Sequence, residues 1–310
     1  MLERQHPATN AQRRITIGSH FRTFVANMSA LNRAYAGGTT IIACQFVKTN
    51  HRGGVAIASA LASGTVALPG SDRQGNVTSM PRSTNHLLAS LPDAAFELLG
   101  PHLQAVDLVH EAVLVQAGDP LTHVYFPHSG VISLVVSLAG GEMIEVAMIG
   151  RTSIMGAFAA LEDRISLNHA IVQLPGTASV LEVERFRKIA EHNTALRDLI
   201  TRHEHFLFAQ AQQSAACNAS HGVEARLARY LLQLRDLSRS DTLLLTQELS
   251  AQMIGARRNS VSMVANTLQH AGVIRYSRGH IEILDLARLR KAACECYVTV
   301  RSHHDRLLRS

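Results

Sequence analysis

Short apolar runs separated by turn residues fill the chain from about residue 85 to residue 184. The runs are Ala112–Val115, Val124–Phe126, Val131–Leu138, Met143–Ile149, Ala170–Gln173 and Ala178–Leu181. Between them lie Gly118-Asp119-Pro120, Pro127, Gly130, Gly140-Gly141, Gly150, Gly156 and Pro175-Gly176. β-rich runs of this length and spacing predict an antiparallel sandwich or roll of the jelly-roll kind. A short helical segment, 87–99, precedes the first strand.

The spacing of apolar residues becomes helical after Glu184. Neither Gly nor Pro interrupts the later part of the stretch up to His221, and its apolar residues include pairs three, four and seven apart. The pattern predicts a long helix over 185–221, which either pairs with the same helix of a second copy or serves as a single core helix. In either case close approach is favoured by its small residues, Ala209, Ala211, Ser214, Ala215 and Ala216.

Residues 222–310 predict a separate helical domain with a hairpin. Val223–Leu237 has a helical apolar face, and 272–284 reads as two strands with a turn at Gly279. Leu286–Tyr297 is expected to close the chain with a helix. The expected fold class is therefore α+β, with a jelly-roll-like β-roll in 80–184, a long helix in 185–221 and a helical domain with a wing-like hairpin in 222–310.

The segment 246–268 carries the clearest functional signal. Thr246 is suited to cap a first helix, Gly255 to make a tight turn, and a polar, basic run opens the second helix. Leu249, Met253 and Ile254 are expected to bury one helix, and Val261, Val264 and Leu268 the other. This is the pattern of a helix-turn-helix, whose second helix enters the DNA major groove.

The predicted DNA contacts are polar residues at the start of the second helix. They are Arg257, Arg258, Asn259, Ser260 and Ser262. Arg makes bidentate contacts with guanine and Asn with adenine, whereas Ser hydroxyls and helix N-termini suit phosphates. The alternatives are a helical hairpin with a solvated basic face, or a sensor or scaffold protein whose winged helix binds another protein.

The distribution of charge supports DNA binding over these two alternatives. The formal net charge is +6, and it is positive over 1–79 and 220–310 but negative over 80–219. A basic domain gains affinity for DNA by releasing counterions, while an acidic domain is repelled by it. An acidic sensor beside a basic reader therefore fits a DNA-binding regulator, although basic surfaces also bind membranes and acidic partners.

The order of these parts resembles the Crp/Fnr family of transcription regulators. The resemblance covers about 87–297 and rests on three further stretches, 124–133 (VYFPHSGVIS), 213–218 (QSAACN) and 255–261 (GARRNSV). It implies a cyclic-nucleotide-binding-like sensor domain in 80–184, a dimerisation helix in 185–221 and a winged helix-turn-helix DNA-binding domain in 222–310. It also implies a homodimer that reads a two-fold symmetric DNA site, with Arg258 and Asn259 at base-reading positions and RNA polymerase as a further partner. Met263 stands where some members have another Arg, so the preferred DNA sequence should differ.

The resemblance weakens at the effector site. Cyclic-nucleotide binders of the family have a Gly-Glu pair that holds the ribose and an Arg-Ser/Thr-Ala run that neutralises the phosphate. Here the matching positions are Gly156-Ala157 and Asn168-His169-Ala170, so both charged residues are missing. His169 when protonated, or nearby Arg164, would be the remaining contact for an anion. We therefore expect an effector other than cyclic AMP or GMP, of unknown identity.

No catalytic or metal-binding constellation is predicted, and the cofactor stays unknown. Glu142 and Glu145 flank a strand and are expected to be solvated. Cys294-x-Cys296 with His303-His304 offers four metal donors, but two packed thiols on a helix are the simpler interpretation. Cys217 is expected to be a small buried residue. The scattered cysteines and the absence of a membrane-spanning apolar run or secretion signal indicate a cytoplasmic protein.

Residues 1–79 differ from the rest of the chain. They are poor in acidic residues, rich in Arg, Ser, Thr, Asn and Gly, and lack a sustained amphipathic period. We interpret them as a disordered or non-native extension, with Met80 as an alternative natural start. A genuine accessory element is the third possibility.

Overall fold

The computed structural model describes residues 46–49, 55–58, 84–161 and 164–309. Two compact units divide the chain, 1–75 and 76–310. In the first unit, strands β1 (Phe46–Thr49) and β2 (Val55–Ala58) pair antiparallel, with Phe46 opposite Ala58. The rest of the predicted extension, including Cys44 and Met80, lies outside the described residues.

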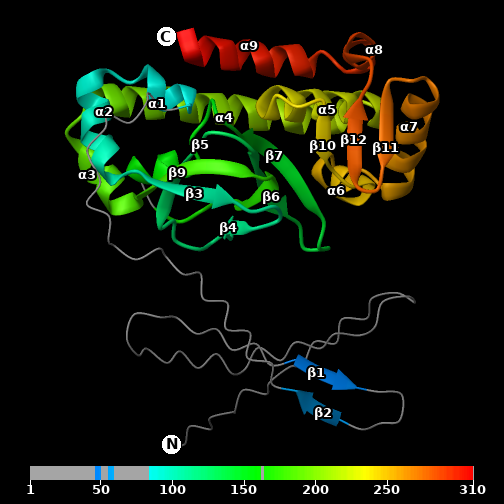
Figure 1. Ribbon diagram of the computed structural model, residues 1–310, viewed down its shortest axis with the longest axis horizontal. Coiled ribbons are helices and arrows are strands. Elements are labelled where there is room, and N and C mark those ends of the chain that lie inside the picture. The colour runs from blue at the N-terminus through cyan, green and yellow to red at the C-terminus, as the bar shows by residue number, and fades with distance from the viewer. Residues whose placement is uncertain (1–45, 50–54, 59–83, 162–163, 310) are drawn as a thin grey trace, which may run out of the picture. The chain divides into compact units, whose positions relative to one another are not determined.

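The second unit begins with the predicted antiparallel β-roll, which is confirmed (Figure 1). One sheet has the order β3-β9-β5 and the other β4-β8-β6-β7, and every pairing is antiparallel. The strands are β3 (Gln104–Leu108), β4 (Val113–Val115), β5 (His123–Pro127), β6 (Val131–Ser137), β7 (Met143–Ile149), β8 (His169–Leu174) and β9 (Gly176–Glu182). Aliphatic side chains of both sheets fill the roll, including Val124, Ile132, Ala170, Val172 and Leu181.

Short helices precede and interrupt the roll. They are α1 (His86–Ser90), α2 (Asp93–Leu99), η1 (Gly100–His102) and η2 (Ala157–Ala160). The fully buried Asn85 fixes α1 in place. Its Oδ1 accepts from the backbone N–H groups of Leu87 and Leu88, and its Nδ2 donates to the carbonyls of Pro127 and Ser153. One side chain thus caps the helix and joins it to the roll.

The single helix predicted over 185–221 is divided in two. Helix α3 spans Val183–Glu191, and α4 spans Thr194–Ser220. The break has a local cause, because Asn193 takes an extended conformation and its side chain caps α4 by accepting from the N–H of Leu196 over 2.9 Å. The helical spacing of the apolar residues is confirmed, but the sequence-based prediction overlooked this cap.

The C-terminal part is a winged helix-turn-helix with its own core. Its elements are α5 (Val223–Ser238), β10 (Thr242–Leu244), α6 (Gln247–Met253), α7 (Arg258–His270), β11 (Ile274–Ser277), β12 (His280–Ile283), α8 (Leu286–Ala292) and α9 (Cys296–Arg309). The predicted hairpin β11–β12 is confirmed, and β10 extends it to a sheet of order β10-β12-β11.

The predicted closing helix 286–297 is wrong in its boundaries. It breaks after α8, because Ala293 adopts an extended conformation, and a new helix begins at Cys296. Helix α9 runs alongside α4 in Figure 1, and the rings of Phe206 and His304 meet edge to face at 5.5 Å. The C-terminal helix therefore covers one side of the long helix.

The roll and the winged helix share a hydrophobic core. Val131, Val135 and Met148 from the outer side of the roll are buried in the same cluster as Leu227 and Tyr230 of α5. The two parts are thus packed directly against each other. Among the described helices, none has the length and apolar character needed to span a membrane.

Candidate nucleic-acid interface and sensor pocket

The helix-turn-helix has the predicted framework. Thr246 caps α6 by accepting from the N–H of Leu249 over 3.1 Å. Gly255 follows α6 with φ +59°, a left-handed conformation that a residue with a Cβ adopts at a cost. Of the six apolar residues predicted to face inward, Met253, Ile254, Val261 and Leu268 are buried and Leu249 and Val264 are half-buried. Both helices are therefore fixed by packing.

The first turn of α7 presents three of the predicted DNA contacts to solvent. Arg257, Arg258 and Asn259 are exposed, and Ser260 is half-buried. Arg258 Nη1 lies 3.1 Å from Glu248 Oε2 of α6, and both side chains are mostly exposed. Exposed ion pairs of this kind contribute little stability, so the guanidinium is available to another anion.

Ser262 is placed differently from the other four residues. It is half-buried, and its hydroxyl donates to Gln247 Oε1 over 2.6 Å. This bond joins the first turn of α6 to α7. Met263, on the next position of α7, is 72 % exposed.

A buried arginine holds the turn between the two helices. Arg226 of α5 is 8 % exposed, and its Nη2 donates to the carbonyls of Ile254 and Gly255, the latter over 3.0 Å. Its Nη1 also reaches the carbonyl of Asn218 in α4, at 3.4 Å. Arg226 thus connects the long helix to the helix-turn-helix. The sequence contains no local signal for this role, since Arg226 resembles any basic residue of an amphipathic helix.

The wing adds basic side chains beside α7. Ser277 pairs with His280 across a two-residue turn in which Arg278 and Gly279 both have positive φ, as tight hairpins require. Arg275 forms an ion pair with Glu282 at 2.8 Å. Arg278, at the tip, is exposed and has no ion-pair partner among the described residues. The wing tip can therefore meet a phosphate backbone.

The five residues predicted for a degenerate effector pocket all lie on the roll. Gly156 precedes η2, and Ala157 is fully buried in the core of the roll. The position where cyclic-nucleotide binders of the family have a carboxylate is thus occupied by a methyl group. Arg164 forms an ion pair with Glu184 of α3, and both side chains are largely exposed.

Asn168 and His169 lie at the start of β8. The Asn168 carbonyl accepts from the Ser166 hydroxyl over 2.7 Å. His169 lies on the same face of β8 as Ile171, whereas Ala170 points into the roll core. The His169 side chain therefore faces the helix-turn-helix side and not the interior of the roll.

His169 lines a cavity of about 340 Å³ between the roll and α6. Its walls come from β8, β4 and β7 on one side and from α6 on the other, where Leu249, Gln252 and Met253 contribute. The walls are mainly apolar. This cavity joins the sensor directly to the first helix of the DNA reader.

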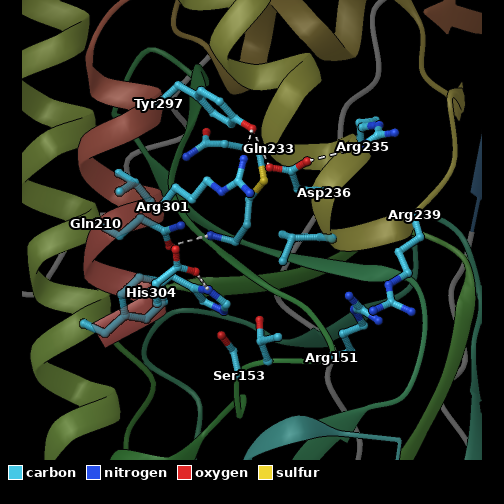
Figure 2. Close-up of a pocket in the computed structure, with 16 residues that line it drawn as sticks. Arg151, Ser153, Gln210, Gln233, Arg235, Asp236, Arg239, Tyr297, Arg301 and His304 are labelled. Carbon is cyan, nitrogen blue, oxygen red and sulfur yellow. Dashed lines mark hydrogen bonds and ion pairs between the residues drawn. The ribbon is translucent and has the colours of Figure 1, made fainter. Parts of the chain in front are cut away.

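A second cavity, of about 390 Å³, lies where β7, α4, α5 and α9 meet (Figure 2). Arg151 and Arg239 lie close together at one side of it, and Arg301 and His304 of α9 lie at another. Burial, and then the charge of Arg239, lower the pKa of Arg151. Neither Arg151 nor Arg239 has a carboxylate partner among the described residues. Two unpaired guanidinium groups at one wall favour an anionic group.

The expectation that Glu145 of β7 is solvated is wrong, because the residue is buried. It is 8 % exposed, and its carboxyl group accepts from the hydroxyl of Ser133. Burial raises the pKa of Glu145 to about 8, although Ser133 and Arg229 act in the opposite direction. Helices α4 and α6 pack against β7, and Arg229 and Tyr230 of α5 lie near the Glu145 carboxyl group, on a surface that the strand pattern alone leaves open to solvent.

The structure does not group the cysteines and histidines as their order in the sequence suggested. Cys294 and Cys296 lie beside Cys217 and His221 at the end of α4. His303 is not part of this group, and His304 lies against Phe206. The sequence signal that could have predicted this group is the Cys-x3-His spacing of Cys217 and His221 at the end of a helix, together with Cys294-x-Cys296. Cys217 is buried, as expected.

Two known domain families match the chain in this order. Residues 106–193 match the cyclic nucleotide-binding domain, and residues 225–292 match the Crp-like helix-turn-helix domain. No curated protein sequence matches the chain closely enough to count as a relative.

Solved structures share the fold. A putative Crp/Fnr regulator from Eubacterium rectale superposes with a TM-score of 0.54 at 18 % identity, covering 66 % of this chain and 96 % of the other. FixK2 from Bradyrhizobium japonicum gives a TM-score of 0.53 at 14 % identity, covering 62 % and 98 %. A CRP-family regulator from Thermus thermophilus gives 0.52 at 23 % identity, covering 61 % and 96 %. With both domains matched, and joined by a long helix, the chain is a member of the Crp/Fnr family of transcription regulators.

Proposed function

We propose that this chain is a homodimeric transcription regulator that binds a specific, two-fold symmetric DNA sequence through α7. The observation that carries the proposal is the first turn of α7. Arg257, Arg258 and Asn259 are exposed there on a helix whose opposite face is buried. These side-chain types read guanine and adenine in the major groove, and the rigid frame sets their position.

Dimerisation is proposed to use α4. Its exposed positions recur every three or four residues along one stripe, which comprises Thr201, His205, Phe208, Gln212, Ala215 and Ala219. This is the spacing of a coiled-coil seam. Phe208 is 64 % exposed in the single chain, and the alanines leave room for a second helix. A dimer of this kind places two α7 helices in successive major grooves.

Control is proposed to come from an effector other than cyclic AMP or GMP. The methyl group of Ala157 and the presence of His169 in place of an arginine argue against the ribose and phosphate contacts of cyclic-nucleotide binders. The core shared by Val135, Met148 and Tyr230 provides mechanical contact between sensor and reader. An effector that prefers one packing of this contact would shift the equilibrium between two arrangements of the reader helices.

Selection from random duplexes tests the proposal. The full chain is incubated with the duplexes at moderate salt, with and without the small-molecule fraction of a cell extract, so that a missing effector does not mask binding. We expect enrichment of a two-fold symmetric site with half-sites about 10 base pairs apart. The control is a variant with Ala at 257, 258 and 259. Failure to enrich any site in both conditions would overturn the proposal and favour a winged helix that binds protein.

A further inference from the structure

Four potential metal ligands converge where the long helix meets the C-terminal helices. Cys217 lies in the last turn of α4, and His221 is the residue that ends this helix. Cys294 and Cys296 lie at the break between α8 and α9. The three Sγ atoms and one imidazole nitrogen all lie within 4.8 Å of one another. The set contains no ligand from the sensor pocket or the DNA-reading turn.

Two of the six separations between these atoms match the edges of a tetrahedral site. Cys217 Sγ lies 3.5 Å from Cys294 Sγ, and Cys296 Sγ lies 3.6 Å from His221 Nδ1. With Zn–S bonds of about 2.3 Å and Zn–N bonds of about 2.0–2.1 Å, a tetrahedron has edges of about 3.5–3.8 Å. A bonded disulfide would instead bring two sulfurs to about 2.05 Å and leave the third thiol and the imidazole without a role.

The ligand set is largely shielded from solvent. Cys217, Cys294 and Cys296 are buried as free thiols, and the His221 side chain is 25 % exposed. Four protein ligands with no open position are typical of a structural zinc site, whereas a catalytic zinc keeps a position for water. Three thiolates and one imidazole in a tetrahedron also favour zinc over calcium or magnesium, which prefer oxygen ligands.

The surrounding side chains fit the same interpretation. His221 Nε2 lies 3.2 Å from Glu295 Oε1, so the carboxylate orients the ring with Nδ1 toward the thiols. Gln213 Nε2 donates to Cys296 Sγ over 2.9 Å. Hydrogen bonds of this kind fix the ligands of metal sites. The buried Arg229 lies near enough to Cys217 to act electrostatically on its thiol, and its charge suits a site whose net charge with zinc is negative.

We propose that Cys217, His221, Cys294 and Cys296 form a structural zinc site. Binding of Zn²⁺ replaces the protons of three thiols, which are released to solvent, and uses the lone pair of His221 Nδ1. The site joins the end of α4 to the α8–α9 junction. Since His221 and Gly222 connect α4 to α5, zinc would fix the connection between the long helix and the DNA-binding domain.

Metal analysis of the full-length protein, purified without a histidine tag, tests this proposal. We expect about one zinc ion per chain after dialysis, by elemental analysis and native mass spectrometry. Cys217→Ser and Cys296→Ser should lose the metal. Cys44→Ser and His303→Ala, which change residues outside the set, should retain it. Should the serine variants fail to fold, Co²⁺ substitution of the wild type must give the visible d–d bands of a tetrahedral site with thiolate charge transfer.

The contrary results are equally clear. A wild type without zinc that also fails to bind added Zn²⁺ would overturn the proposal. So would an intact mass lower by two hydrogens, which marks a disulfide, or the absorption of an iron–sulfur cluster. Zinc retained in both serine variants would place the metal elsewhere. Zinc content does not depend on DNA binding, so this test and the selection of duplexes can fail separately.

Discussion

Arg226 Nη2 donates a hydrogen bond to the carbonyl oxygen of Gly255 over 3.0 Å, so a residue of α5 holds the turn on which the DNA-reading helix depends. The same guanidinium also bonds the carbonyls of Ile254 and Asn218. These three carbonyls belong to segments on either side of α5. The position of the reader helix is therefore tied to the end of α4 by one buried side chain.

Replacement of Arg226 by Met should destabilise the protein and weaken DNA binding. The aliphatic part is kept, but buried carbonyls lose their donor, and each such loss costs about 1–3 kcal/mol. Chemical denaturation at a fixed chain concentration measures the change in the free energy of unfolding. Arg275→Met is the matched control, because its ion pair with Glu282 is exposed and should contribute less than about 1 kcal/mol. Equal effects of the two substitutions would show that the contacts of Arg226 are not structural.

Glu145 predicts a pH dependence of stability. Burial raises its pKa in the folded chain from 4.5 to about 8, so between these pH values the folded state binds more protons than the unfolded state. The stabilisation is present in full below about pH 4.5 and is lost as the pH rises toward about 8. Glu145→Gln keeps a polar group beside Ser133 but removes the titration.

Denaturation curves recorded across this pH range test the role of Glu145. In the wild type, this one group should lower the free energy of unfolding by up to about 1.4 kcal/mol per pH unit within that window. The Gln variant should lack this contribution and be the more stable protein near pH 8. Glu142→Gln, at an exposed position in the turn before β7, is the control and should leave the slope unchanged. An identical slope in wild type and Glu145→Gln would contradict the assigned protonation.

Phe208 tests the proposed dimer. Its side chain is 64 % exposed in the single chain, and burial of a Phe against a partner contributes roughly 1.5–3 kcal/mol. Phe208→Glu should raise the dimer dissociation constant by at least about tenfold, as measured by sedimentation velocity over a range of concentrations. Leu167→Glu introduces the same charge at a site that is 80 % exposed on the roll, and should leave the association unchanged. A dimer unaffected by Phe208→Glu would exclude the α4 seam.

The sequence predicted the parts of this molecule whose causes are local. Thr246 caps a helix through its own hydroxyl, and Gly255 adopts a left-handed backbone conformation in the turn. Both signals therefore lie within a few residues. The alternating runs of the roll and the polar start of α7 are equally local. These signals were sufficient for the β-roll, the helix-turn-helix and the exposure of Arg257, Arg258 and Asn259.

The missing parts depend on contacts between distant segments. Glu145 is buried because α4 and α6, from much later in the chain, pack against β7 with side chains of α5 beside them, and no pattern within the strand indicates this. Cys217 and Cys294 meet across 77 positions. The division of α3 from α4 at Asn193 was the exception, since its cap is local and was available to the sequence-based prediction.

The affinity of the full chain for its selected duplex, compared with single-base variants of that duplex, tests the central claim most directly. Fluorescence anisotropy is measured for the wild type and for Arg258→Ala, with Arg278→Ala at the wing tip as the matched control. We predict that Arg258→Ala loses about 1–3 kcal/mol on the selected site and no longer discriminates at one base pair of each half-site. Arg278→Ala should weaken all duplexes alike and reduce the salt dependence. Full discrimination by Arg258→Ala at every base pair would contradict base reading by this residue, and wild-type affinity that ignores both sequence and salt would contradict DNA recognition through α7.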